Sequence, residues 1–213
     1  MKISFIGAGK MAQMLAPRVI RAGHQVVLSN SRGPDTLQDN VEKLGPSASA
    51  ASVAEAVEGA DIVVLATPWG KIKDAVSGAA SWRDRVLIDP TNNRTKPGPD
   101  GLIDIGGRGS SEFVSELVPG AKVVKTLNYE PIPIFDAGFD QASPKAVFIA
   151  GDDDGAKKKV AQLFSDLGVE AIDVGNLASG DKLLMGGGAL SLSMRVLTPD
   201  EARERLAQVQ ASD

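Results

Sequence analysis

Short apolar runs alternate with helical patterns along most of the chain. The first run, Ile3 to Ile6, ends at Gly7-Ala8-Gly9 and leads into a stretch whose apolar residues recur at helical spacing. A second run, Val26 to Leu28, follows a turn at Gly23. Further apolar runs stand at residues 61–68, 85–89, 121–128, 145–151 and 169–175. Most of the runs are continuous, which is typical of parallel strands that are buried on both faces.

Helical patterns fill the intervals between these runs. Residues 52–58 begin with Ser52 and Glu55 at the spacing of a capping box, and helices are also predicted over residues 69–80, 110–118 and 152–167. The alternation predicts an α/β fold, a doubly wound Rossmann-type and mainly parallel sheet with a small C-terminal α/β extension. We expect one domain over residues 1–127, and an extension over residues 128–213 that completes the sheet and a second-substrate pocket.

Two Gly- and Pro-rich segments, residues 90–109 and 128–144, predict long loops. The closing segment, residues 181–206, shows a helical pattern interrupted by Gly186–Gly188. Because each glycine costs roughly 0.5–1 kcal/mol relative to alanine inside a helix, we expect a ring or a neighbouring backbone to approach closely there.

Composition narrows the class of protein. The chain has 213 residues, 43% of them hydrophobic, and a net charge of −4, so we expect a sizeable core and no nucleic-acid partner. It has no cysteine and one histidine, which excludes thiolate chemistry and a histidine relay, and we expect no metal site. No apolar stretch reaches the roughly 18 residues that a membrane span needs. We therefore expect a cytoplasmic protein that does not contact membranes.

The turn after the first apolar run carries the pattern G-x-G-x-x-A, at Gly7, Gly9 and Ala12. Between a strand and a helix, the first glycine permits a tight turn and the second lets the backbone approach a pyrophosphate, while the alanine allows close helix packing. The unpaired amides at the helix start add partial positive charge. The turn predicts a dinucleotide site, which also includes the intervening residues Ala8, Lys10 and Met11.

The stretch after the second run bears on which dinucleotide binds. About 20 residues beyond the glycines, NAD-binding proteins carry Asp or Glu, which bonds to the ribose 2′-hydroxyl. This chain has Asn30, Ser31 and Arg32 there. Two neutral donors and a guanidinium suit the 2′-phosphate of NADP, which an acid would repel. The alternative is that Arg32 is a solvated loop residue.

The ends of other predicted strands add candidates, because ligands of parallel sheets bind at the carboxyl ends of the strands. Pro68 has a fixed φ and no amide hydrogen, and Trp69 offers a flat wall or else covers the helix start. Other polar residues at strand ends suit a ribose or carboxamide, or satisfy the loop backbone instead: Thr67, Thr91, Asn92 and Asn128.

The motifs match a known family in order and spacing: G-A-G-K-M-A at 7–12, S-N-S-R at 29–32, A-T-P-W at 66–69 and G-D-D-D at 151–154. With the closing helical segment, they resemble the prokaryotic NADPH-dependent reductases of the deazaflavin coenzyme F420 over nearly the whole chain. The Rossmann module also resembles that of membrane ferric reductases.

The resemblance implies a homodimer that transfers a hydride reversibly between NADP(H) and a small-molecule acceptor, a deazaflavin or a flavin. It implies that the cofactor lies on the Gly7–Met11 turn, with its 2′-phosphate at Ser31 and Arg32 and its nicotinamide near Pro68. The second ring would then lie against residues 128–135 and the closing helix.

Two other functions stay open. An NADPH-dependent carbonyl or imine reductase needs a proton donor beside the hydride, and Tyr129, the single tyrosine, is the candidate. A non-catalytic NADP(H)-binding redox sensor needs no catalytic side chain. Hydride transfer to a flavin-like ring needs none either, because stacking and orientation supply most of the rate. For the ring mechanism we therefore predict no catalytic side chain.

Overall fold

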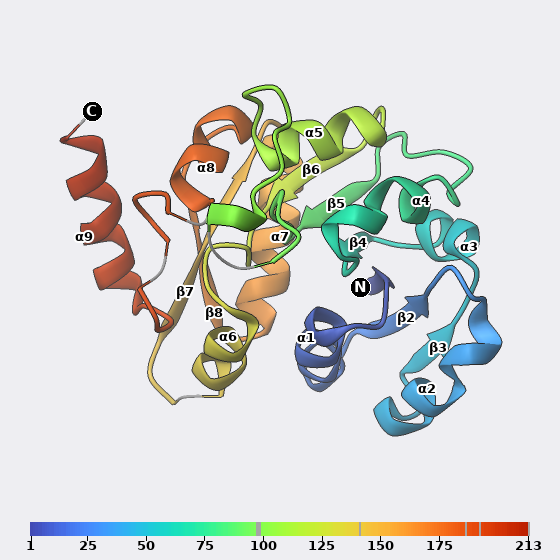
Figure 1. The fold of residues 1–213 in the computed structure, drawn as a ribbon. Helices are drawn as coiled ribbons and strands as arrows, with labels where there is room; N and C mark the ends of the chain where they lie inside the picture. Colours follow the sequence, from blue (N-terminus) through green and yellow to red (C-terminus); the bar gives the residue numbers. More distant parts are fainter. Residues whose placement is uncertain (97–98, 141, 186, 192, 213) are drawn as a thin grey trace.

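A computed structural model describes residues 1–96, 99–140, 142–185, 187–191 and 193–212. Among these residues, a sheet of eight strands has the order β3-β2-β1-β4-β5-β6-β7-β8 (Figure 1). Its strands are β1 (Lys2–Ile6), β2 (Gln25–Ser29), β3 (Ala48–Ala50), β4 (Ile62–Leu65), β5 (Val86–Asp89), β6 (Lys122–Lys125), β7 (Lys145–Gly151) and β8 (Val169–Asp173). All neighbouring strands are parallel except β6 and β7. This confirms the predicted doubly wound, mainly parallel α/β fold.

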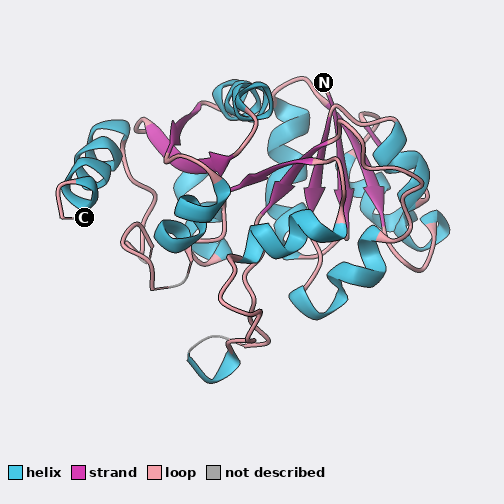
Figure 2. Cartoon of the chain, turned by 90° about the horizontal axis from the view of Figure 1, so that it is seen from above, coloured by secondary structure: helices cyan, strands magenta, loops and turns pink. Residues whose placement is uncertain are grey.

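Helices cover both faces of the sheet (Figures 1 and 2). They are α1 (Lys10–Arg21), α2 (Gln38–Leu44), α3 (Val53–Glu58), α4 (Ile72–Val76), α5 (Ser110–Leu117), α6 (Ile132–Phe139), α7 (Asp154–Asp166), α8 (Leu177–Leu184) and α9 (Pro199–Gln210), with short 3₁₀ helices η1 (Pro34–Leu37), η2 (Trp69–Lys71) and η3 (Pro99–Gly101). Within the described ranges, no helix combines the length and the apolar character that crossing a membrane would require.

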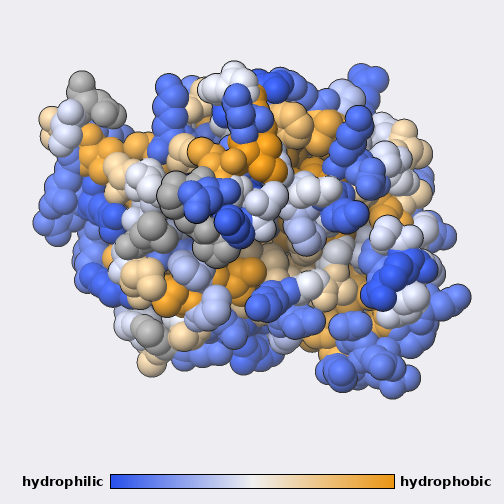
Figure 3. All heavy atoms as spheres, in the orientation of Figure 1, coloured by the Kyte–Doolittle hydropathy of each residue, from blue (hydrophilic) through white to orange (hydrophobic). Residues whose placement is uncertain are grey.

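β4 shows why the strands read as continuous apolar runs. Ile62 and Val64 lie in one hydrophobic core, with residues of α1 and α7, whereas Val63 and Leu65 lie in a second core with residues of α4 and α5. Successive side chains of a strand point to opposite faces, and here both faces are covered. In Figure 3, apolar residues reach the middle of the face seen in Figure 1, and hydrophilic residues occupy most of its periphery.

The sheet reverses direction between β6 and β7, where Val124 pairs with Gly151 in antiparallel register. The carboxyl ends of β1 to β6 lie at one edge of the sheet, and that of β7 lies at the opposite edge. The G-D-D-D motif therefore stands away from the glycine turn. Its Asp153 accepts a hydrogen bond from the Ala156 N–H at the start of α7 and pairs with Lys122 at 3.3 Å, so this acid caps a helix.

Several predicted elements were wrong in detail. The 128–144 segment was predicted as a loop but contains α6, whose prolines stand before and within its first turn, where an amide hydrogen is not needed. The helix predicted over residues 69–80 ends at Val76. The short elements α2 and β3 carry too few residues to show a pattern.

Gly187 and Gly188 of the closing segment do not lie inside a helix. α8 ends at Leu184, and Gly187 has φ +102°. A Cβ on Gly188 would lie 2.4 Å from the Leu183 carbonyl oxygen, so a neighbouring backbone is what approaches closely. Gly186 lies outside the described residues.

Residues 90–109 form the predicted long connection, from β5 to α5. Arg94 and Leu102 make an isolated antiparallel bridge, and η3 follows within the same excursion. Figure 2 shows the described part of this segment projecting from the body of the molecule. Leu102 is 48% exposed on it.

Candidate dinucleotide-binding site

Two hollows meet at the carboxyl ends of β1 and β4, where the strand order changes direction. The Ser31 hollow, of about 370 Å³, is lined by Ile6, Gly7, Ala8, Gly9, Asn30, Ser31, Val53, Ala66, Thr67, Pro68, Lys71, Asp74 and Ala75. The Trp69 hollow, of about 350 Å³, is lined by Gly9, Lys10, Met11, Leu65, Ala66, Thr67, Pro68, Trp69, Pro90, Thr91, Asn92 and Ile132. Because four residues line both, the hollows form one elongated site at the switch point where open α/β sheets bind ligands.

The two positions of the turn carry glycine for different structural reasons. Gly7 has φ +103°, and a Cβ there would lie 2.4 Å from the Ala66 carbonyl oxygen. The fold itself therefore requires glycine at this position. A Cβ on Gly9 would have no closer neighbour than the same oxygen, at 3.7 Å, and its φ is −79°. The protein alone would accept a side chain at Gly9, and the open space at the helix start suits a ligand.

The start of α1 carries no compensating negative charge. Gly9 is its N-cap without a side-chain cap, and its first turn contains no acidic residue. The free N–H groups and the positive end of the helix dipole are thus available to an anion.

The loop after β2 is held by one of its predicted ligand residues. Asn30 Oδ1 accepts a hydrogen bond from the Arg32 N–H at 2.8 Å, and Asn30 Nδ2 donates to Thr36 Oγ1 at 3.0 Å. The Ser31 side chain is left to line the hollow. Arg32 is exposed and does not line it, and its guanidinium has no hydrogen bond or ion pair within the described residues of the chain.

Flat and apolar side chains dominate the Trp69 hollow. The Trp69 ring packs against Phe113 of α5, with the ring centroids 5.4 Å apart. Ile132 enters from the start of α6, which is fixed to α1 because Arg18 donates to the Asp136 carboxylate at 2.8 Å. Helix α1, which starts at the glycine turn, and the Ile132 wall are therefore held together.

Hydrogen bonds behind the Trp69 hollow hold in place the wall that is formed by the residues after β5. The Thr91 N–H and Oγ1 both donate to Asp89 Oδ1, at 2.9 and 2.6 Å. Asn92 Nδ2 donates to the Asn128 carbonyl, and Asn128 Nδ2 donates to Asn92 Oδ1 and to the Leu184 carbonyl. Asn128 itself is buried and does not line the hollow. It positions Asn92 and connects this wall to α8.

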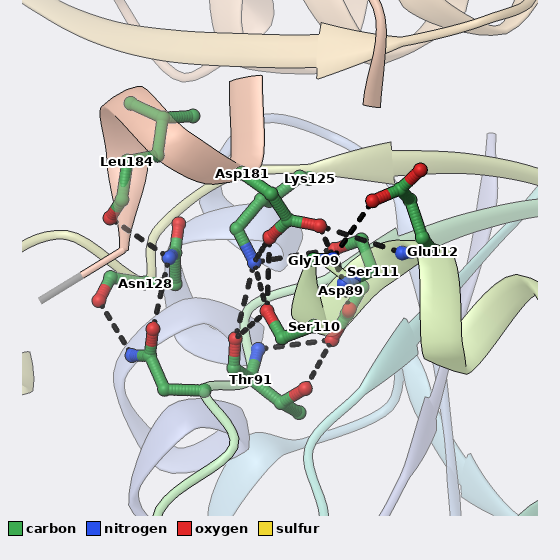
Figure 4. A network of polar contacts seen from close by, with 11 residues as sticks. Asp89, Thr91, Gly109, Ser110, Ser111, Glu112, Lys125, Asn128, Asp181 and Leu184 are labelled. Carbon is green, nitrogen blue, oxygen red and sulfur yellow. Dashed lines mark hydrogen bonds and ion pairs between the residues drawn. The ribbon is translucent and has the colours of Figure 1, made fainter. Parts of the chain in front are cut away.

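A buried ionic network lies next to this wall (Figure 4). The Lys125 ammonium of β6 pairs with Asp181 Oδ1 of α8 at 2.6 Å and donates to Ser110 Oγ at 2.5 Å. Asp181 Oδ2 accepts from the Ser111 N–H at the start of α5, and Ser111 Oγ donates to Asp89 Oδ2. Lys125 and Asp89 have no exposed surface. The network joins the ends of β5 and β6 to α5 and α8.

Sequence reasoning missed this network. One signal was present, a lysine inside the apolar run 121–128, because a charge buried in a strand requires a partner. Its partner on α8 is distant in the sequence, and no local pattern names it.

A third hollow, of about 810 Å³, lies between the projecting segment and α8, and Ser110 and Asp181 belong to its wall. Its volume lies within the range of small-molecule sites. The side chain of Lys182, which also lines this hollow, has no hydrogen bond or ion pair with the described residues.

Most of the predicted site residues come together at the two hollows, and three do not line them: Ala12, Arg32 and Asn128. Ala12 is buried against the core, as expected for close helix packing. Two charged residues that the motifs did not single out, Lys71 and Asp74, do line the Ser31 hollow. They lie beyond Trp69 in a stretch without a recognisable spacing.

Tyr129 lies away from both hollows. It is buried, its hydroxyl accepts a hydrogen bond from the Phe148 N–H at 3.0 Å, and its ring packs edge-on against Phe135. Burial raises the pKa of Tyr129 well above its ordinary value. The hydroxyl therefore has a structural role, because it accepts a hydrogen bond from a buried backbone N–H of β7.

The sheet order, the glycine turn and the paired hollows define a Rossmann-type dinucleotide-binding protein. The model of the family described as NADP oxidoreductase, coenzyme F420-dependent, matches residues 2–93. The structure resembles hypothetical protein SMa0349 from Sinorhizobium meliloti, with 35% identity, a TM-score of 0.82, and coverage of 94% of this chain and 96% of that one. The chain belongs to the family described as NADP oxidoreductase, coenzyme F420-dependent.

Two further relatives are more distant. A structure from Arthrobacter sp. FB24, described as an F420-dependent NADP-reductase, is 28% identical with a TM-score of 0.71, over 85% of this chain and 87% of that one. The metalloreductase STEAP3 of Rattus norvegicus is 28% identical over 183 residues, which are 84% of this chain and 34% of the relative. The chain thus spans about a third of the length of that curated relative.

Proposed function

We propose that this protein transfers a hydride between NADP(H) and a flavin-like ring, with a deazaflavin of the coenzyme F420 type as the preferred acceptor. The observation that carries the proposal is the lining of the Trp69 hollow. Its walls include Met11, Pro68, Trp69 and Ile132, and among its described lining residues Lys10 alone has a titratable side chain.

The acceptor's chemistry explains why such a lining favours a ring. A carbonyl or an imine develops charge on one atom and needs a placed proton donor. A flavin-like ring spreads the incoming charge and takes its proton from water. Because Tyr129 is buried away from the hollow, the proton donor considered for a carbonyl acceptor is missing from the lining.

The residues present fit NADP(H). The open space at Gly9 and the uncompensated start of α1 suit the pyrophosphate, and Ser31 with the unpaired Arg32 suits the 2′-phosphate. The Trp69 hollow would take the nicotinamide. When bound, NADPH would supply a hydride, which is one proton together with two electrons, and would leave as NADP⁺.

The chain's own contribution is orientation. The Trp69 ring is held by Phe113, and the Asn92 amide is held by Asn128. Rigid walls restrict how two stacked rings lie and bring the reacting atoms near the roughly 3–3.5 Å of a near-attack geometry. In this mechanism no side chain needs to change its protonation state.

Relatives support the acceptor class. The Arthrobacter protein is described as an F420-dependent NADP-reductase, and it matches most of this chain at 28% identity. The name of the rat relative gives it a metalloreductase activity, but this chain spans a minor fraction of that protein. We therefore place the deazaflavin first.

The test is turnover with defined acceptors. NADPH deuterated at nicotinamide C4 is mixed without oxygen with coenzyme F420, with FMN, and with a cyclic imine and a simple ketone. We expect the deazaflavin to be reduced and to carry the deuterium. Reduction of the imine or ketone alone would favour the carbonyl or imine reductase. Tight NADPH binding without turnover of any acceptor would favour the redox sensor.

The resemblance also supports a cytoplasmic homodimer in which residues 1–127 bind NADP and residues 128–213 bind the acceptor. We propose this organisation together with the function. Light scattering of the purified protein should give twice the mass of the chain, and a mass equal to that of a single chain would refute the dimer.

A further inference from the structure

Lys71 and Asp74 are opposite charges that line the Ser31 hollow without pairing. They stand three residues apart, where η2 passes into α4, and both are exposed. Among the described residues neither side chain has a hydrogen bond or an ion pair, whereas the same spacing pairs Asp154 with Lys157 at 3.2 Å. Two complementary charges held apart in a hollow are available to a ligand.

Lys71 and Asp74 follow, along the chain, the residues that lie beside the glycine turn. Thr67 and Pro68 line both hollows together with Gly9, so the pyrophosphate of a dinucleotide would cross there. Lys71 follows about one turn later, and Asp74 another turn on, beside the apolar Ala75. Of the two charged residues, Asp74 is therefore farther along the chain from the residues where the phosphates would lie.

A carboxylate in this hollow has to be explained, because it would repel the phosphate groups of NADP unless a donor meets it. In NADP the ribose 2′-oxygen carries the phosphate. The adenylate half then offers two hydrogen-bond donors, the 6-amino group of adenine and the ribose 3′-hydroxyl. The small apolar side chains of Val53 and Ala75 line the same hollow and suit the flat face of a base.

We propose that Asp74 determines specificity for the adenine base of NADP(H) by accepting a hydrogen bond from its 6-amino group, with Lys71 balancing the charge. The inference rests on the proposed binding of the adenylate half in the Ser31 hollow. It adds a selection for the base, which the Arg32 guanidinium cannot make because it addresses the phosphate.

The experiment compares NADPH with deamino-NADPH, in which hypoxanthine carries a carbonyl in place of the 6-amino group. Both are titrated by fluorescence into the native protein, Asp74→Asn and Asp39→Asn. Asp39 is an exposed acid of α2 that lines neither hollow, so its variant controls for net charge. Circular dichroism checks that each variant is folded.

We expect the native protein to prefer NADPH at least tenfold, the lower end for a hydrogen bond to a charged group. Asp74→Asn should narrow the preference to about twofold, since an amide can also donate to the hypoxanthine carbonyl. Asp39→Asn should keep the native preference.

Equal binding of the two dinucleotides by the native protein would overturn the inference and leave the proposed function intact. A native preference that persists in Asp74→Asn, or equal weakening of both dinucleotides in that variant, would also overturn it. A native protein that binds neither dinucleotide would refute the proposed function itself.

Discussion

At the scale of single residues, Gly7 and Gly9 show that one motif can contain two different requirements. The Ala66 carbonyl oxygen would clash with a Cβ on Gly7 and would tolerate one on Gly9. The first glycine is needed to build the turn, whereas the fold does not require the second, for which we propose a role in binding the pyrophosphate. Substitutions at the two positions should therefore separate folding from binding.

Gly9→Val is expected to abolish NADPH binding in a folded protein, because its side chain would occupy the space of the pyrophosphate. The backbone at Gly9 is extended, which valine accepts. Thermal unfolding and NADPH titration measure the two effects. Gly7→Ala is the matched control and should instead destabilise the fold, since φ is +103° there. Full NADPH affinity in folded Gly9→Val would move the site elsewhere.

Arg32→Ala is expected to weaken NADPH binding by about 1.5–3 kcal/mol, the range for a hydrogen bond to a charged group. NADH lacks the 2′-phosphate, so its affinity should hardly change. Calorimetric titration of both cofactors gives the comparison. Arg21→Ala, an exposed arginine at the far end of α1, serves as the control for loss of charge. Equal binding of NADH and NADPH by the native protein would contradict the role given to this loop.

Tyr129→Phe is expected to change the turnover rate only a few fold, whereas loss of a general acid costs on the order of a hundredfold or more. Its cost should fall on stability instead, by about 1–3 kcal/mol, because the buried Phe148 N–H loses its acceptor. Steady-state kinetics and urea unfolding separate these effects. A loss of turnover of a hundredfold or more, with unchanged NADPH affinity, would favour the carbonyl reductase as the function of this protein.

At the scale of elements, the network around Lys125 shows how the extension is joined to the Rossmann strands. One ammonium from β6 lies between a carboxylate at the end of β5 and one from α8. Ser110 and Ser111, at the start of α5, bridge the three charges. Thr91 and Asn128, which follow β5 and β6 in the chain, fix one wall of the Trp69 hollow. Loss of the network should loosen that wall.

Lys125→Met is expected to destabilise the protein by about 3–5 kcal/mol, because it leaves buried carboxylates without their counter-charge. Adding Asp181→Asn should recover some of that loss, since the amide oxygen can still accept from Ser111. Urea unfolding of the two single variants and the double variant gives the coupling energy. A loss below about 1 kcal/mol for Lys125→Met would show that the network does not stabilise the fold.

At the scale of the whole molecule, the sequence predicted features that depend on neighbouring residues and missed features that depend on the packing of distant segments. Gly7, Gly9 and Ser31 were singled out as candidates because a glycine turn and a strand end are recognisable from local sequence, and all three line the Ser31 hollow. The reversal at β6 and β7 was not, because a continuous apolar run such as residues 145–151 reads alike in either direction. The contact between Lys125 and Asp181 depends on packing of distant segments. Local patterns therefore indicated candidate residues at strand ends but not the packed residues behind them.

β6 is flanked on its outer side by β7, and this pairing bears on any shortened form of the chain. A fragment ending at Leu127 would present β6 as a bare edge strand whose backbone donors and acceptors can template pairing with another copy. It would also leave the Lys125 ammonium without its Asp181 partner. We therefore expect residues 1–127 to aggregate when they are produced alone, because residues 128–213 cover the β6 edge and pair with Lys125.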